Sequence, residues 1–106
     1  MAWIYLFVAV LGEIVWGLTL RLADGYTNVR WSVINFVVSV SNVITLSRAM
    51  VEIPVMLAYP IWIGLGAIGV FIGAIFLFGE PWGIGQIISI GLIITGVIGL
   101  RVFAPS

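Results

Sequence analysis

The chain has 106 residues, of which 63% are hydrophobic and only 8% are charged, with four basic and four acidic side chains in balance. This composition excludes a soluble domain, which needs more charge to cover its surface, and indicates one integral membrane domain over residues 1–106. The balanced charge excludes a basic patch for nucleic acid. The lack of cysteine and histidine excludes disulfides, thiolate metal sites and the commonest general base, so we expect no metal and no cofactor.

Four apolar segments have the length of a membrane helix, and the expected fold is all-α with four short transmembrane helices. We expect these helices at residues 3–20, 31–48, 54–78 and 84–103. The connections between them are short, which forces neighbouring helices to run antiparallel. Four helices of this size make a thin bundle with little room for a substrate cavity. We therefore expect a site at the interface of an oligomer.

Glu13 is the only acidic residue well inside one of these segments. If the helix begins near Trp3, a rise of about 1.5 Å per residue places Glu13 roughly 15 Å into a hydrocarbon core about 30 Å thick. An ionised carboxylate at that depth must face protein or water, and by default it marks an ion or substrate site. The alternative is a protonated glutamate that serves helix packing. Trp16 follows three residues later and shares the helix face of Glu13.

Tyr59 and Trp62, at a spacing of three in the third segment, can both face Glu13. The tyrosine hydroxyl and the indole N–H are donors that can hold a carboxylate, and the ring faces can pack on a flat or quaternary cation. The alternative for any of these aromatic residues is a place at the level of the lipid headgroups. That alternative suits better the tryptophans at helix ends, which are Trp3, Trp31 and Trp82.

The third segment also contains Pro60 and the pair Gly64 and Gly66, which predict a bent helix. Gly66, Gly69 and Gly73 follow one another at spacings of three and four residues, so they lie on one face of the helix. Such a stripe of small residues lets another backbone pack closely. It can serve as a sliding or hinge surface for alternating access, or only for helix packing.

Polar side chains lie on one face of the second segment, at Asn35, Ser39 and Asn42. Such groups seek partners inside a membrane protein. Ser39 or Asn42 can hydrogen-bond the substrate or Glu13, and the alternative is a bond between helices.

The fourth segment carries small residues four apart, Gly91, Thr95 and Gly99. This spacing is typical of a helix-dimerisation face. Because the segment has no charge between Ile84 and Leu100, we assign it to a dimer contact and not to the site.

Five pieces of the sequence, in their order and spacing, resemble the small multidrug resistance family of bacterial exporters, and the resemblance covers the whole chain. The pieces are Glu13-Ile-Val-Trp16, Asp24-Gly25-Tyr-Thr27, Ala58-Tyr59-Pro-Ile-Trp62-Ile-Gly64-Leu-Gly66, Phe78-Gly-Glu80-Pro81 and Gly96-Val-Ile-Gly-Leu-Arg101. Trp16 and the piece Ile98-Gly-Leu-Arg101 near the C-terminus are similar to the guanidinium-exporter branch. The promiscuous quaternary-ammonium branch tends to have a small residue at position 16.

The resemblance implies an antiparallel dimer in the bacterial inner membrane that exchanges a guanidinium-type cation for protons, without enzyme chemistry. Glu13 would be the shared proton and substrate site, and Trp16, Tyr59 and Trp62 would line it. A planar guanidinium suits carboxylates because its donors form a fork.

The sequence departs from the pattern of this branch at Asn42, where serine is usual, and at Met56-Leu57, Pro60 and Ile63. Three alternatives therefore stay open. The substrates can be broader, as with quaternary-ammonium cations, or the subunit can pair with an unlike homologous subunit. In a different class, the chain is a structural or regulatory membrane subunit that transports nothing.

The loop arginines predict no fixed orientation in the membrane. Four helices place Arg48 and Arg101 on one side and Arg21 and Arg30 on the other, two against two. Orientation normally follows an excess of Lys and Arg in the cytoplasmic loops. A chain without that excess can insert both ways and pair with its own inverted copy.

Overall fold

The computed structural model describes residues 1–103 and contains four α-helices in this part of the chain. They are α1 (Ala2–Leu22), α2 (Val29–Ala49), α3 (Val55–Phe78) and α4 (Ile84–Val102). Each helix is long enough and apolar enough to cross a membrane. The predicted all-α membrane fold is therefore confirmed.

Six of the eight helix ends differ from the predicted ones by one or two residues, whereas the end of α3 at Phe78 and the start of α4 at Ile84 agree. The helix α1 continues through Arg21 to Leu22 instead of ending at residue 20. The helix α2 begins at Val29 because Asn28 caps it, with Asn28 Oδ1 accepting a hydrogen bond of 3.1 Å from the Trp31 backbone N–H. Pro54 precedes the first residue of α3 and does not lie inside the helix. At its other end α3 stops at Gly79, whose φ of 63° is left-handed.

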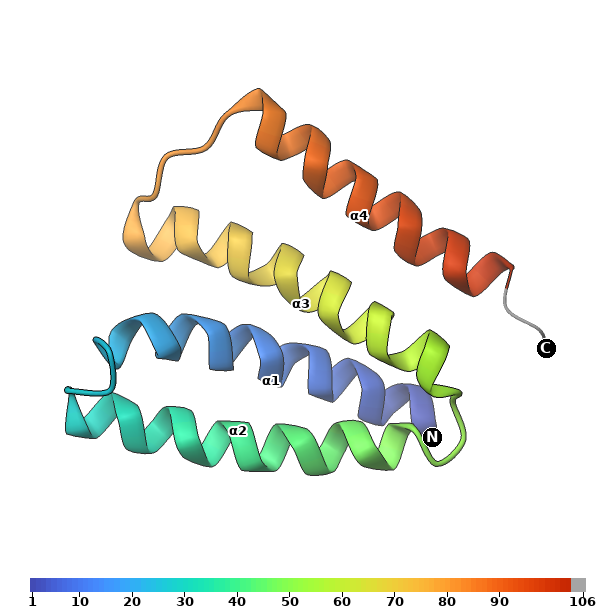
Figure 1. Ribbon diagram of the computed structural model, residues 1–106, viewed down its shortest axis with the longest axis horizontal. Helices are drawn as coiled ribbons and strands as arrows, with labels where there is room; N and C mark the ends of the chain where they lie inside the picture. The colour runs from blue at the N-terminus through green and yellow to red at the C-terminus, as the bar shows by residue number, and fades with distance from the viewer. Residues whose placement is uncertain (104–106) are drawn as a thin grey trace.

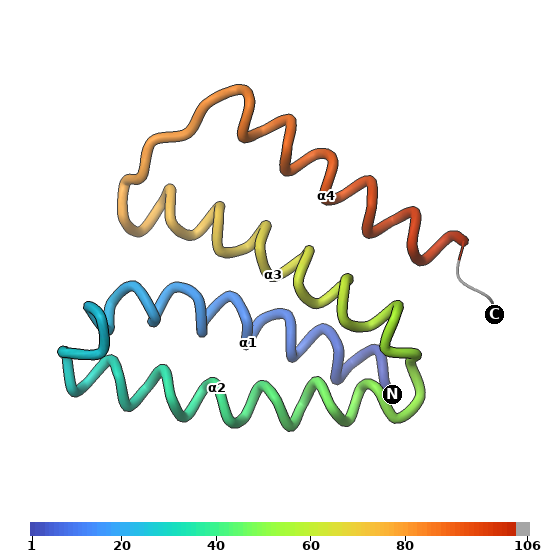
Figure 2. The backbone as a smooth tube through the Cα atoms, viewed as in Figure 1, coloured from blue at the N-terminus to red at the C-terminus, as the bar shows by residue number. Residues whose placement is uncertain are grey.

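The helices lie side by side in the order α2, α1, α3, α4, as Figures 1 and 2 show. The helix α1 packs between α2 and α3, whereas α4 packs against α3. The principal extents of 45 × 35 × 17 Å show that the thin bundle expected from the sequence is a flat layer of helices. In consequence α1, which contains Glu13, has a helix neighbour on two sides only.

The apolar core occupies one end of this layer, where α1 begins, α2 ends and α3 begins (Figure 1). It consists of small and branched side chains that allow close helix contact: Ala2, Leu6, Ala9, Leu46, Ala49, Ile53, Leu57, Ala58 and Ile61. The partly buried ring of Trp62 packs against this core. The core therefore fixes the relative positions of α1, α2 and α3 immediately beside the helix turn that carries Glu13.

Candidate functional site

A pocket of about 320 Å³ lies where α1, α2 and α3 meet. It is lined by all six side chains that the sequence nominated for substrate or proton binding: Glu13, Trp16, Ser39, Asn42, Tyr59 and Trp62. Val43 and Ile63 complete the wall. Residues up to 50 positions apart in the chain, from Glu13 to Ile63, thus meet because α1 lies between α2 and α3 (Figure 1).

The backbone of α3 provides the surface on which Glu13 rests. A Cβ atom built at Gly66 would lie 2.5 Å from Glu13 Cγ. The other glycines of the predicted stripe are related to α1 in the same way, since a Cβ at Gly69 would meet Ile14 and a Cβ at Gly73 would lie 2.8 Å from Leu18 Cδ1. The stripe is thus a packing surface for the α1 side chains, and whether it also slides remains a prediction.

Trp62 joins α3 to the turn of α1 that precedes Glu13. Its indole Nε1–H donates a hydrogen bond of 3.1 Å to the backbone carbonyl oxygen of Ala9, four residues before Glu13. The sequence pointed to this N–H as a donor to the carboxylate, whereas the structure uses it to hold the backbone. The Tyr59 ring lies 5.5 Å from the Trp62 ring, centroid to centroid, at an interplanar angle of 47°. Together the two rings form an aromatic wall of the pocket.

The polar face of α2 divides into two parts with different surroundings. Asn35 is fully buried and bonds to α1, with its Nδ2 donating to the Trp16 carbonyl oxygen at 2.8 Å. Asn42 is only 6% exposed, packs against Gly12 and lines the pocket, yet its amide makes no hydrogen bond within residues 1–103. Ser39 is partly buried and lines the pocket beside it. Asn35 therefore links two helices, and Asn42 leaves donor and acceptor atoms available at the pocket.

The charges of the described residues are arranged so that Glu13 is alone at the middle of the helices. The other acids, Asp24, Glu52 and Glu80, are exposed and lie outside the helices. Residues 1–103 contain no cluster of three or more His, Asp or Glu side chains that could hold a metal ion. A carboxylate with aromatic walls and free amide atoms is suited to an organic cation, because the carboxylate accepts its N–H donors and the rings face its charge.

Comparison with known proteins identifies the family to which this chain belongs. A family model described as "Small Multidrug Resistance protein" matches residues 1–93. The chain belongs to the small multidrug resistance family. It is 40% identical over 101 residues to a guanidinium exporter of Yersinia pseudotuberculosis serotype I (strain IP32953), a match that covers 95% of this chain and 97% of the relative.

Two further relatives of the family agree with the first. A guanidinium exporter of Citrobacter freundii is 40% identical over 101 residues, covering 95% of this chain and 96% of its own. A guanidinium exporter of Salmonella typhimurium (strain LT2) is 40% identical over 104 residues, covering 98% and 99%. Family membership and four spanning helices make the chain a multi-pass transporter of the bacterial inner membrane.

In this family member, α3 runs as one continuous helix through Pro60, so the predicted bend at this residue stays a prediction. Gly64 faces the opposite neighbour from Gly66: a Cβ at Gly64 would lie 2.7 Å from Val97 Cγ2 on α4. Glycines two residues apart thus allow close approach of α4 on one face of α3 and of α1 on the other. The contact with α4 gives Gly64 a role that the sequence alone did not assign to it, whereas Gly66 packs closely on a neighbouring helix as the predicted stripe implies.

The face of α4 that the sequence analysis assigned to a dimer contact is open in this structure. A Cβ at Gly91 or at Gly99 would meet nothing within 4 Å, and Thr95 is exposed. The Thr95 hydroxyl donates a 2.8 Å hydrogen bond to the Gly91 carbonyl oxygen within the same helix. The face therefore has no unsatisfied polar group and is free to receive another helix.

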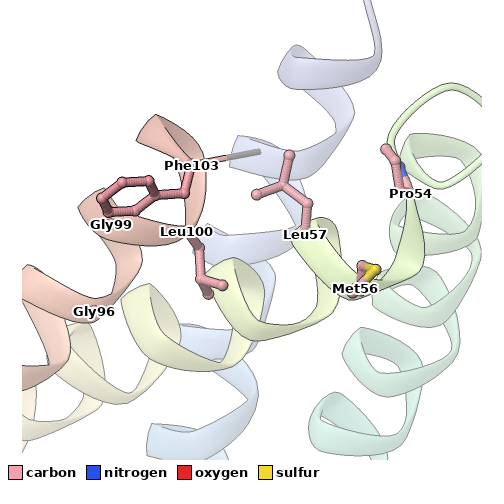
Figure 3. A pocket seen from close by; sticks show the side chains of 7 residues that line it. All are labelled: Pro54, Met56, Leu57, Gly96, Gly99, Leu100 and Phe103. Atoms are coloured by element: carbon pink, nitrogen blue, oxygen red, sulfur yellow. The ribbon is translucent and has the colours of Figure 1, made fainter. Parts of the chain in front are cut away.

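A second hollow of about 330 Å³ lies between the start of α3 and the end of α4, as Figure 3 shows. Its wall consists of apolar side chains and glycines: Pro54, Met56, Leu57, Gly96, Gly99, Leu100 and Phe103. Since none of these side chains carries a charge, the groove offers nothing to balance a cation. The Glu13 pocket is therefore the better candidate site.

Sequence reasoning missed two features of the site. Val43 was not singled out because an apolar residue in a membrane helix carries no chemical signal of its own. Gly12 was also missed, although its lack of a side chain lets Asn42 pack against α1. A small residue adjacent to Glu13 was the available signal for this contact.

Proposed function

We propose that this chain is the subunit of an exporter that exchanges guanidinium-type cations for protons, with Glu13 as the site that both occupy. The observation that carries the proposal is the pocket in which Glu13, the one carboxylate at membrane depth, lies with the aromatic wall of Tyr59 and Trp62 and the buried amide of Asn42. The curated relatives named guanidinium exporter support the choice of substrate.

The chemistry of guanidinium matches the groups at the pocket. Its planar set of N–H donors forms a fork that fits a carboxylate with two parallel hydrogen bonds. A donor that the carboxylate leaves free can bond a side-chain oxygen of Ser39 or Asn42, which both line the pocket. The flat faces of the cation can stack on Tyr59 and Trp62.

Exchange follows if one carboxylate serves both cargoes. A protonated Glu13 has lost the charge that attracts the cation, and a bound cation occupies the oxygens that a proton needs. Each cargo then leaves only when the other replaces it, so a proton gradient drives the cation outward. No bond in the substrate is made or broken in this cycle, which describes a transporter and not an enzyme.

The proposal includes a second copy of the chain in the opposite orientation, or a homologous subunit in its place. Glu13 is only partly buried and Tyr59 is 48% exposed, although both lie in helices of membrane-spanning length. Lipid contact with a carboxylate is costly, so another protein surface is expected to close the pocket. The open face at Gly91, Thr95 and Gly99 is the proposed contact.

The test is guanidinium-driven proton movement in proteoliposomes that contain this chain alone, read by a pH-sensitive dye inside the vesicles. Guanidinium added outside should raise the internal pH of vesicles with wild-type protein and not that of empty liposomes. A larger pH change with tetraethylammonium than with guanidinium would favour the broader quaternary-ammonium exporter. No pH change with either cation would contradict transport by the chain alone and favour an unlike partner or a structural subunit.

A further inference from the structure

A hydrogen-bonded bridge joins the first loop, α2 and α1 at the helix turn that carries Trp16. At its centre is Asn35, which is fully buried. Asn35 Nδ2 donates to the Trp16 carbonyl oxygen at 2.8 Å and to Thr19 Oγ1 at 3.0 Å, and Asn35 Oδ1 accepts from the Tyr26 hydroxyl. Both ends of the Asn35 amide are thus bonded to protein groups.

The first loop adopts a backbone that brings Tyr26 to this bridge. Asp24, Gly25 and Tyr26 all have left-handed backbones, with φ values of 51°, 68° and 66°. Such a conformation is unfavourable for a bulky residue such as tyrosine. The loop is held by a 2.6 Å hydrogen bond from Thr27 Oγ1 to the Asp24 carbonyl oxygen and by the Tyr26 bond to Asn35. The contact with α2 therefore compensates for an unfavourable backbone.

The bridge is directional, whereas the other contacts between α1 and its neighbours near the pocket are mostly apolar. Gly17 faces Val70 and Gly69 faces Ile14, and such surfaces allow a helix to shift or rotate slightly. A hydrogen bond to a backbone carbonyl fixes both depth and rotation. Within a membrane no water replaces a lost partner, so displacement of α1 would leave the buried amide unsatisfied.

We propose that Asn35, Tyr26 and Thr19 are positioning residues of the cation site, which hold the Trp16 ring at the pocket wall by fixing the turn of α1 to which it belongs. This inference rests on the proposed function, because the position of Trp16 affects cation binding only if the pocket binds the cation. Because Tyr26 lies in the loop at the membrane edge, the bridge also makes the pocket wall dependent on the conformation of that loop.

Transport kinetics test the bridge with isosteric changes. Tyr26→Phe should raise the KM for guanidinium in proteoliposomes by about threefold, the average effect of one hydrogen bond between membrane helices, and Asn35→Leu, which removes all three bonds of the amide, should raise it further. The double variant should be no worse than Asn35→Leu alone, because both changes break one chain of bonds. Thermal unfolding of the same samples shows that they are folded. An unchanged KM in folded variants, or additive effects, would overturn the bridge.

Matched controls come from residues outside the bridge. Ser32→Ala alters the same face of α2 at a hydroxyl that is buried without a hydrogen-bond partner in the described chain, so its KM should equal that of wild type. Tyr5→Phe removes a tyrosine hydroxyl elsewhere and should be equally neutral. A rise in KM with both controls would show that any polar loss disturbs transport, which contradicts a specific bridge.

A spectroscopic readout separates this inference from the proposed function. The chain has five tryptophans, and 5-fluorotryptophan labelling gives each a ¹⁹F resonance, with that of Trp16 assigned through Trp16→Phe. Tyr26→Phe and Asn35→Leu should shift the Trp16 resonance and leave that of Trp82, in the third loop, in place. This shift without guanidinium transport by wild type would support the bridge and contradict the function. An unmoved Trp16 resonance in a transporting protein would overturn the bridge.

Discussion

Gly66 of α3 lies directly against the side chain of Glu13 on α1. A Cβ atom at Gly66 would fall 2.5 Å from Glu13 Cγ and 3.2 Å from Glu13 Cβ, closer than side chains normally approach. Gly66 is itself buried, so the aliphatic part of Glu13 is enclosed by backbone while the residue still lines the pocket. The absence of one side chain on α3 thus determines where the carboxylate can be.

Gly66→Ala is therefore expected to displace Glu13 and impair transport. Alanine favours a helix over glycine by about 1 kcal/mol, but overpacking costs about 1–3 kcal/mol, and here the crowded atoms belong to the proposed cation site. Guanidinium transport should fall by about tenfold while the protein stays helical by circular dichroism.

Gly85→Ala is the matched control for this change. A Cβ at Gly85, in the first turn of α4, would meet nothing within 4 Å. Its transport should equal that of wild type. Equal transport by the two variants would show that the contact between Gly66 and Glu13 does not affect transport.

Glu13→Gln should abolish proton-coupled transport and leave the fold intact. Glutamine has nearly the shape of glutamate, but it can neither attract a cation by charge nor exchange a proton. Glu52→Gln, an exposed change outside the helices, is the control that should retain transport. Uphill guanidinium transport by purified Glu13→Gln protein, driven by a proton gradient, would refute the central role of this residue.

The helices and the residues around Glu13 could be predicted from the sequence, whereas the layer and the polar contacts could not. A carboxylate and amides stand out in an apolar segment because placing polar groups in the membrane costs free energy and therefore indicates a function. The paired aromatic residues stand out because they lie deeper than the headgroup level. The partner of each donor depends on how helices rotate about their axes, which composition does not reveal. The Trp62 N–H was accordingly considered a donor that could hold the Glu13 carboxylate, and instead it bonds the Ala9 carbonyl oxygen.

Other features needed the arrangement of the helices as well. The role of Asn35 follows from a left-handed turn at Tyr26, and the sequence gives only a turn signal at the preceding Asp24-Gly25. The open layer follows from α4 packing mainly on α3, a choice that its apolar surface leaves undetermined.

Changes to the aromatic wall should impair transport more than a change at the membrane edge. Trp62→Phe removes the N–H that bonds the Ala9 carbonyl oxygen, and Tyr59→Phe removes a hydroxyl at the pocket. Both variants should raise the KM for guanidinium. Trp82→Phe alters a residue that is 57% exposed in the third loop and should have no such effect. Equal KM values in the three variants would mean that the aromatic wall does not contact the substrate.

The open face of α4 allows a test of assembly that leaves the subunit itself undisturbed. Gly91→Leu adds a side chain where a Cβ meets nothing within 4 Å, so the subunit should fold as before. If this face packs on another copy, the larger side chain prevents close helix approach and the dimer dissociates. Sedimentation equilibrium in detergent should then give a monomer, whereas Gly85→Leu, also open, should stay associated. A Gly91→Leu dimer of unchanged affinity would place the interface elsewhere.

The last prediction concerns orientation in the membrane. Arg21 lies in the last turn of α1, and its Nε atom is 3.7 Å from Glu80 Oε2 in the third loop, so it remains on the side of that loop. The balance of two arginines against two therefore holds, and no excess of positive charge fixes the topology. We expect the chain to insert in both orientations in similar amounts.

Two single-cysteine variants test this expectation from opposite ends of the helix layer. The chain has no cysteine, so one introduced cysteine would be its only thiol. A cysteine at Ser106 would serve, but that position lies outside the described residues. We therefore choose Val51→Cys in the second loop, at a residue that is 81% exposed, and Gly83→Cys in the third loop, where a Cβ meets nothing within 4 Å; the two loops lie on opposite sides of the membrane. An impermeant thiol reagent should label about half of each variant in intact cells if insertion is random. Complete labelling of one and none of the other would establish a single orientation, and the antiparallel partner would then have to be an unlike subunit.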